Sequence, residues 1–194
     1  PRATNRIVFR LWANSPVTRE GGARETARVT TMPTGARTRL SSDRTTLTIN
    51  LKRPLKRGQV VLVELAYSVR LPRPAGIFRL ARGPGFVRLG SFFPLLALDA
   101  KGTWATDPPS HTAAETWVSP AAVWDARISA PKGWTVVATG VPGEGGRWHA
   151  DAVRDFAIVA STFARSGAVA LAPKPVRVTA VAADAATASV FAIR

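Results

Sequence analysis

The feature that most constrains this chain is an alternating run of apolar and polar residues around a sharp turn, VWDARISAPKGWTVVATG at 123–140. From Val123 to Ala130 one face is apolar and the other mostly polar, which is the period of a half-buried strand. Pro131 and Gly133 then favour a reversal, because proline presets φ and glycine accepts positive φ. A more apolar run follows, so the segment predicts a hairpin within a larger antiparallel sheet.

Similar short runs recur along the chain, with proline and glycine between them. We expect strands at 6–12, 23–32, 45–52, 59–71, 154–164 and 175–183. The strand at 59–71 is expected to be the longest, with Val60 and Leu62 covered at one end. The apolar segment 88–98 contains Pro94. Because proline cannot donate to a sheet, we expect this segment to be a bend, an edge strand or a strand broken at Pro94.

Many short strands with almost no helix predict an all-β fold, an antiparallel β-sandwich. We expect residues 1–183 to form this domain. At Asp184 the period changes and an aspartate can cap a helix, so residues 184–194 are expected to begin a linker or helix.

Composition excludes several classes of site and structure. The chain has no cysteine, so it has no disulfide, thiolate metal site or cysteine nucleophile. No apolar run is long enough to span a membrane, and the first ten residues hold no hydrophobic signal core.

The formal net charge of +15 lies almost entirely in the first half of the chain. Residues 1–90 hold 18 Lys and Arg against 4 Asp and Glu, whereas residues 91–194 hold 9 against 8. Three interpretations stay open: arginines filling solvated strand faces, a face that docks an acidic partner or domain, and nucleic-acid binding. We favour the first and rank nucleic acid last.

Catalytic patterns are absent from the sequence. The only histidines, His111 and His149, have no zinc-ligand spacing and are expected to be ordinary surface or partly packed side chains. No Gly-x-Ser-x-Gly elbow occurs. The glycine-rich stretch 140–146 joins two predicted strands, so we expect a hairpin loop. Asp151 and Asp155 lie at strand boundaries and are expected to serve turns rather than acid/base chemistry.

The tryptophans divide into two groups. Trp12, Trp124 and Trp134 fit core positions. Trp104 and Trp117 lie in a long polar loop at 102–120, where they either pack under the loop or stack on a ligand. We favour packing.

Four segments in order carry a family resemblance: FFPLLALD at 92–99, GTW at 102–104, ISAPKGWTVVATG at 128–140 and DFAIVAS at 155–161. Together they resemble the N-terminal domain of the aminopeptidase N family, the gluzincin zinc metallopeptidases. The resemblance covers the chain to about Ala183 and implies a saddle-like β domain. The family's usual FPCFDEP reads FPLLALD here.

The resemblance implies that the catalytic parts lie in a domain following Arg194. The family's His-Glu-x-x-His zinc site, its Gly-x-Met-Glu-Asn segment and its catalytic tyrosine have no counterpart in this chain. We therefore expect a noncatalytic domain that packs on, and helps to wall, the active site of a zinc peptidase. No metal, cofactor or catalytic residue is expected in this chain, and the resemblance implies that zinc would be bound by the following catalytic domain.

The expected partners are the chain's own catalytic domain and, through the parent enzyme, a peptide substrate. The surface expected to face the other domain or the substrate consists of Phe92, Phe93, Pro94, Trp104 and Trp117. The alternative is a freestanding β-sandwich that binds carbohydrate or protein, with Trp104 and Trp117 as aromatic platforms.

Overall fold

The computed structural model describes residues 3–72, 79–111, 119–163, 165–170 and 176–181, the last two ranges by their backbone alone. In the first half the strands are β1 (Thr4–Arg10), β2 (Arg24–Thr31), β3 (Arg37–Leu40), β4 (Thr46–Leu55), β5 (Glu64–Arg70), β6 (Ala81–Gly83) and β7 (Phe86–Leu89). In the second half they are β8 (Leu95–Leu96), β9 (Ala122–Arg127), β10 (Thr135–Ala138), β11 (Val141–Pro142), β12 (Arg147–Val153), β13 (Ile158–Ser161), β14 (Arg165–Ala170) and β15 (Val176–Val181). The described helical elements are η1 (Trp12–Asn14), α1 (Pro16–Glu20) and η2 (Glu144–Gly146).

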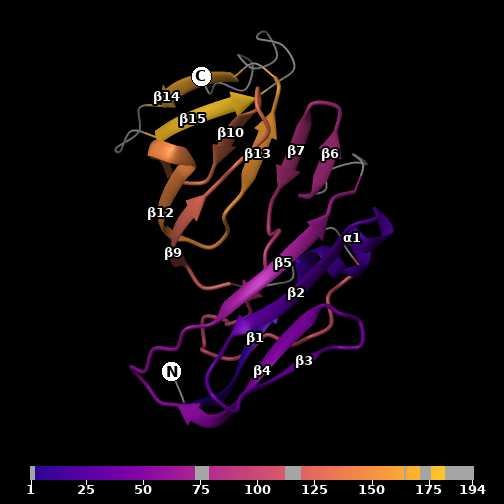
Figure 1. The fold of residues 1–194 in the computed structure, drawn as a ribbon, viewed down its shortest axis with the longest axis vertical. Coiled ribbons are helices and arrows are strands. Elements are labelled where there is room, and N and C mark those ends of the chain that lie inside the picture. Colours follow the sequence, from indigo (N-terminus) through magenta and orange to yellow (C-terminus); the bar gives the residue numbers. More distant parts are fainter. Residues whose placement is uncertain (1–2, 73–78, 112–118, 164, 171–175, 182–194) are drawn as a thin grey trace.

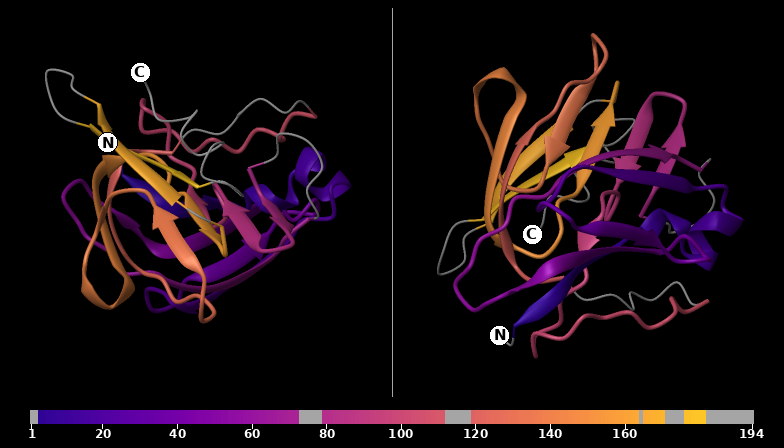
Figure 2. Two further views of the ribbon diagram at one scale, coloured as in Figure 1. Left: turned by 90° about the horizontal axis from the view of Figure 1, so that it is seen from above. Right: turned by 60° about the horizontal axis from the view of Figure 1, so that its bottom comes forward.

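The strands form five antiparallel sheets, in the orders β3-β4-β1-β8, β10-β13-β7-β6, β11-β12-β9, β14-β15 and β2-β5. Figure 1 shows β1–β5 gathered at one end of the molecule and β9–β15 at the other. The right-hand view of Figure 2 shows the same division, with the orange and yellow strands above the indigo and purple ones. The predicted all-β antiparallel fold is confirmed.

The N-terminal end is a two-layer packing of sheets. Ile7 on β1 and Ile49 on β4 lie opposite each other and are buried, and Val29 on β2 packs against them. The β2-β5 pair therefore covers the apolar face of β3-β4-β1-β8. The prediction for 45–52 is confirmed, because Leu47 and Ile49 face this core.

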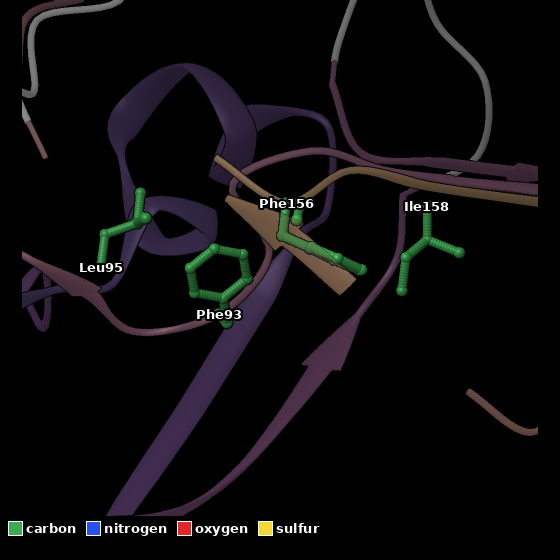
Figure 3. Close-up of a cluster of buried hydrophobic side chains, with 5 residues drawn as sticks. Phe93, Leu95, Phe156 and Ile158 are labelled. Atoms are coloured by element: carbon green, nitrogen blue, oxygen red, sulfur yellow. The ribbon is translucent and has the colours of Figure 1, made fainter. Parts of the chain in front are cut away.

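The other core brings together residues far apart in the sequence. Phe93, Leu95, Phe156 and Ile158 are buried in one cluster with Ala150, as Figure 3 shows. Half-buried side chains from β9, β10 and β12 surround the cluster, including Trp124, Val136 and Trp148. Burying large side chains of this kind contributes about 1.5–3 kcal/mol each.

The predicted hairpin at 123–140 is wrong in its pairing, although both strands exist. β9 pairs with β12, and β10 pairs with β13, so the two strands belong to different sheets. The faces were predicted correctly: Trp124, Ala126 and Ile128 pack against the core while Val123 is exposed. The turn at Pro131 and Gly133 is present, since the Trp134 N–H donates to the Pro131 carbonyl, but it carries the chain from one sheet to another.

The predicted long strand at 59–71 is also corrected. β5 begins only at Glu64, and Val60 and Leu62 are 96% and 69% exposed instead of covered. Val61 and Val63 still pack against the N-terminal core, so this segment alternates sides without pairing in a sheet. Apolar alternation alone cannot tell a paired strand from an extended segment lying on a core.

The remaining elements follow local chemistry. Pro94 separates β7 from the two-residue β8, as expected. The hairpin loop at 140–146 is confirmed, because β11 pairs with β12 across it. Pro16 occupies the first turn of α1, where its missing N–H costs nothing. The expected helix start at Asp184 lies outside the described residues. Within the described ranges, no helix is long and apolar enough to cross a membrane.

Candidate functional site

The segment Phe92–Pro94 lies between the two ends of the molecule. Phe93 is only 7% exposed and belongs to the core, with its ring 4.6 Å from that of Trp124. It therefore does not form part of a surface, which corrects its place in the predicted set. Phe92 and Pro94 are half-buried, and the Phe92 ring meets Phe93 edge-on at 5.2 Å.

Trp104 lies where the polar loop returns to the N-terminal core. Its indole N–H donates to the Thr4 hydroxyl at 2.9 Å, and its half-buried ring packs against the cluster around Ile7 and Ile49. Of the two roles that the sequence leaves open, this geometry favours packing. Trp117 lies outside the described residues. The four members of the predicted set that the structure describes, Phe92, Phe93, Pro94 and Trp104, thus do not form one exposed site.

Asp155 connects two segments that border the core around Phe93 and Phe156, which we call the second core. Its carboxylate accepts hydrogen bonds from the Ser91 backbone N–H and hydroxyl, at 3.0 and 2.7 Å, and from the Phe156 N–H at 2.8 Å. The guanidinium of Arg79 lies 3.7 Å away. These contacts give Asp155 a structural role at a strand boundary, of the kind that the sequence indicates.

His149 lies between two carboxylates on the exposed side of β11-β12-β9. Its Nδ1 lies 2.8 Å from Asp125 and its Nε2 3.3 Å from Asp151. The hydrogen bonds to Asp125 and then to Asp151 raise the pKa of the imidazole above its ordinary value. Both ring nitrogens are thereby engaged, so the three side chains form a linear arrangement and not a convergent metal site.

His111 is exposed on the polar loop. Among the residues described, no group of three or more histidine, aspartate or glutamate side chains is arranged to hold a metal ion.

Glu25 is a buried carboxyl that the sequence pattern did not reveal. It lies on β2, within the heavily charged strand predicted at 23–32, yet it is 2% exposed. Its Oε2 accepts from the Ala13 N–H at 3.3 Å, while Oε1 has no partner among the described residues. Burial raises the pKa of Glu25 to about 8. The only signal in the sequence was a lone acid among arginines and threonines.

Arg10 is a second buried ionisable side chain that the sequence pattern did not reveal, at 2% exposure. Its Nη1 donates to the Thr46 hydroxyl at 2.7 Å, and its Nη2 donates to the Asp107 carbonyl. Its place between Val8 and Trp12 in an apolar run was the available signal that both sides of β1 are covered.

In comparison with known proteins, the chain matches no family model, no curated protein and no solved structure. What the structure defines is an all-β antiparallel domain whose buried polar groups tie distant segments together.

Proposed function

We propose that this chain is a noncatalytic β domain of a zinc aminopeptidase-like protein, in which it packs against a separate catalytic domain and helps to wall that domain's active site. The proposal begins from the ordered resemblance of four sequence segments to the N-terminal domain of the aminopeptidase N family. On this proposal, the full protein that contains this domain hydrolyses amino-terminal peptide bonds.

The single observation that supports it most is where those segments lie. Three of the four meet in one cluster: Phe93 and Leu95 from the first, Val136 and Ala138 from the third, and Phe156 from the last. The hydrogen bonds between Ser91 and Asp155 join the same regions. Segments that pack together in one core depend on one another for folding. A domain with the same fold would therefore keep these segments in the same order along the chain.

On this proposal the resembling segments supply packing and not chemistry. Phe93, Leu95 and Phe156 are buried side chains with no group that can transfer a proton or bind a metal. Zinc and the peptide-binding groups would come from the catalytic domain. Phe92 and Pro94, which are half-buried, remain candidates for the surface toward that domain.

Two measurements test the two parts of the proposal. Calorimetric titration of the chain with zinc should show no stoichiometric site, and the chain alone should not hydrolyse aminoacyl substrates. A micromolar zinc site or intrinsic peptidase activity would refute the noncatalytic part. The coding sequence after Arg194 should continue into a His-Glu-x-x-His segment; a stop codon there would refute the parentage.

A further inference from the structure

One face of the sheet β3-β4-β1 carries a line of arginines and threonines. Residues opposite each other in an antiparallel pair project to the same face. Arg37 lies opposite Asn50, which lies opposite Arg6. In the next row Arg39 lies opposite Thr48, which lies opposite the buried Val8. This face, which we call the arginine face, is defined by six residues of those rows and of the row that follows: Arg6, Arg10, Arg37, Arg39, Thr46 and Thr48.

A hollow of about 280 Å³ lies at one end of the arginine face. Its walls consist of six serines and threonines, Arg10, Arg39, Asp43 and Pro108. No aromatic side chain lines it, so it lacks the ring platform on which sugars usually stack. Two arginines beside a single carboxylate also disfavour a metal cation.

Part of this lining is already held in place. Arg10 is fixed at the buried side by its hydrogen bonds to the Thr46 hydroxyl and to the Asp107 carbonyl. Asp43 accepts from the Ser41 hydroxyl at 2.5 Å, and from the Thr45 N–H and hydroxyl at 3.1 and 2.8 Å. The Asp43 carboxylate is thus held by three hydrogen bonds within its own loop, and the loop Ser41–Thr45 is preorganised around it.

The rest of the lining offers donors. Arg39 is exposed and, among the described residues, forms no ion pair or hydrogen bond; the hydroxyls of Ser42, Thr48 and Thr106 likewise have no partner there. Arginine presents planar, paired N–H groups that match the oxygens of a carboxylate or phosphate. Arg37 and Arg6, on the adjacent row, add positive potential.

We propose that this hollow binds an oxyanion group, a phosphate or a carboxylate, with Arg39 as the pairing cation and the hydroxyls of Ser42, Thr48 and Thr106 as further donors. Arg10 supplies a fixed positive charge behind the site. The proposal is independent of any catalytic domain, because all of its groups belong to this chain.

The test is a titration of the ¹⁵N-labelled chain with inorganic phosphate, and separately with acetate, at constant ionic strength, followed by amide chemical shifts. Saturable shifts should centre on Ser42, Thr48 and Thr106. Saturation by phosphate alone would show that the hollow binds a phosphate group. Saturation by acetate would show that it binds a carboxylate. Absence of saturation with both anions would overturn the proposal.

Matched variants distinguish anion binding at this specific site from general electrostatic attraction to a basic protein. Arg39→Gln should weaken binding at least about tenfold, because it removes a charge-assisted hydrogen bond. Arg28→Gln removes the same charge from an exposed position on β2 and should leave binding unchanged. Thr48→Val, which preserves volume, should weaken binding severalfold. Equal losses in Arg39→Gln and Arg28→Gln would show counterion attraction only and would overturn the site.

Discussion

The carboxylate of Asp155 holds Ser91, 64 positions earlier, through both the backbone N–H and the hydroxyl of that serine. Ser91 is 1% exposed and has a positive φ of 49°, a conformation that is costly for a residue other than glycine. The two hydrogen bonds stabilise this strained turn just before Phe92 and Phe93 enter the core.

Replacing Asp155 with alanine should lower the free energy of unfolding by about 1–3 kcal/mol, because the buried N–H of Ser91 would lose its acceptor. Chemical denaturation measures the change. Glu144→Ala is the control: this exposed acid in η2 should alter stability by less than about 0.5 kcal/mol. Equal effects of the two variants would contradict the proposed role of Asp155.

Stability should fall as pH rises through the neutral range because of Glu25. Its folded pKa of about 8 lies above the ordinary glutamate pKa of 4.5, so the unfolded chain releases this proton at a lower pH than the folded chain does. The contribution is fully favourable below about pH 4.5 and is lost as pH rises to about 8. Thermal unfolding between pH 5 and 9 measures the slope.

Glu25→Gln should flatten this pH dependence and raise the melting temperature at pH 8 to 9. The amide keeps an acceptor for the Ala13 N–H and carries no charge to bury. Glu20→Gln, at an exposed position at the end of α1, is the control and should leave the slope unchanged. An unaltered slope in Glu25→Gln would show that another group controls it.

Two glycines with similar backbone angles should respond differently to alanine. Gly133 has a φ of +83° with open space around it, whereas Gly140 has a φ of +95° and a Cβ there would lie 2.1 Å from the His149 carbonyl oxygen. Gly133→Ala should cost about 1 kcal/mol through backbone strain alone. Gly140→Ala should cost at least about 3 kcal/mol, because strain and a backbone clash act together. Similar losses on denaturation would contradict the close approach at Gly140.

The pKa of the His149 imidazole should lie above the ordinary histidine pKa of 6.5. Asp125→Asn and Asp151→Asn should each lower its pKa, and the double variant should lower it most, because each substitution removes an acceptor for an imidazolium N–H. Titration of the ring signals by NMR measures this. Any stability that the charged pairings give is present below pH 6.5 and is lost as pH rises through the folded pKa. An unchanged pKa in the double variant would rule out the arrangement.

The sequence predicted the fold class and most strands because side-chain alternation directly reflects one buried face. The apolar face of β9 and the buried run in β13 follow from that period. The sequence did not predict which strands pair with each other. The turn after Ile128 has ordinary hairpin chemistry, and nothing local indicates that β9 finds its partner in β12 and β10 in β13.

The burial of two ionisable side chains could not be predicted from the sequence for a related reason. Glu25 and Arg10 occupy strand positions where a charged residue usually faces water. Their burial depends on what packs over them: the Ala13 N–H approaches Glu25, and the Asp107 carbonyl reaches Arg10 from a segment almost a hundred positions away. Such contacts are tertiary, and a one-dimensional pattern carries no record of them.

The separation of β9 from β10 has a consequence for how the chain acquires its structure. A strand that does not pair with its neighbour in sequence cannot form a local hairpin. β10 can pair only after β13 has been brought close, and the pairing of β7 with β13 closes a loop of some seventy residues. Closing such long loops costs entropy before any contact is gained, which slows folding in proteins dominated by distant pairings. We expect refolding on a timescale of roughly milliseconds to seconds, with the second core forming late.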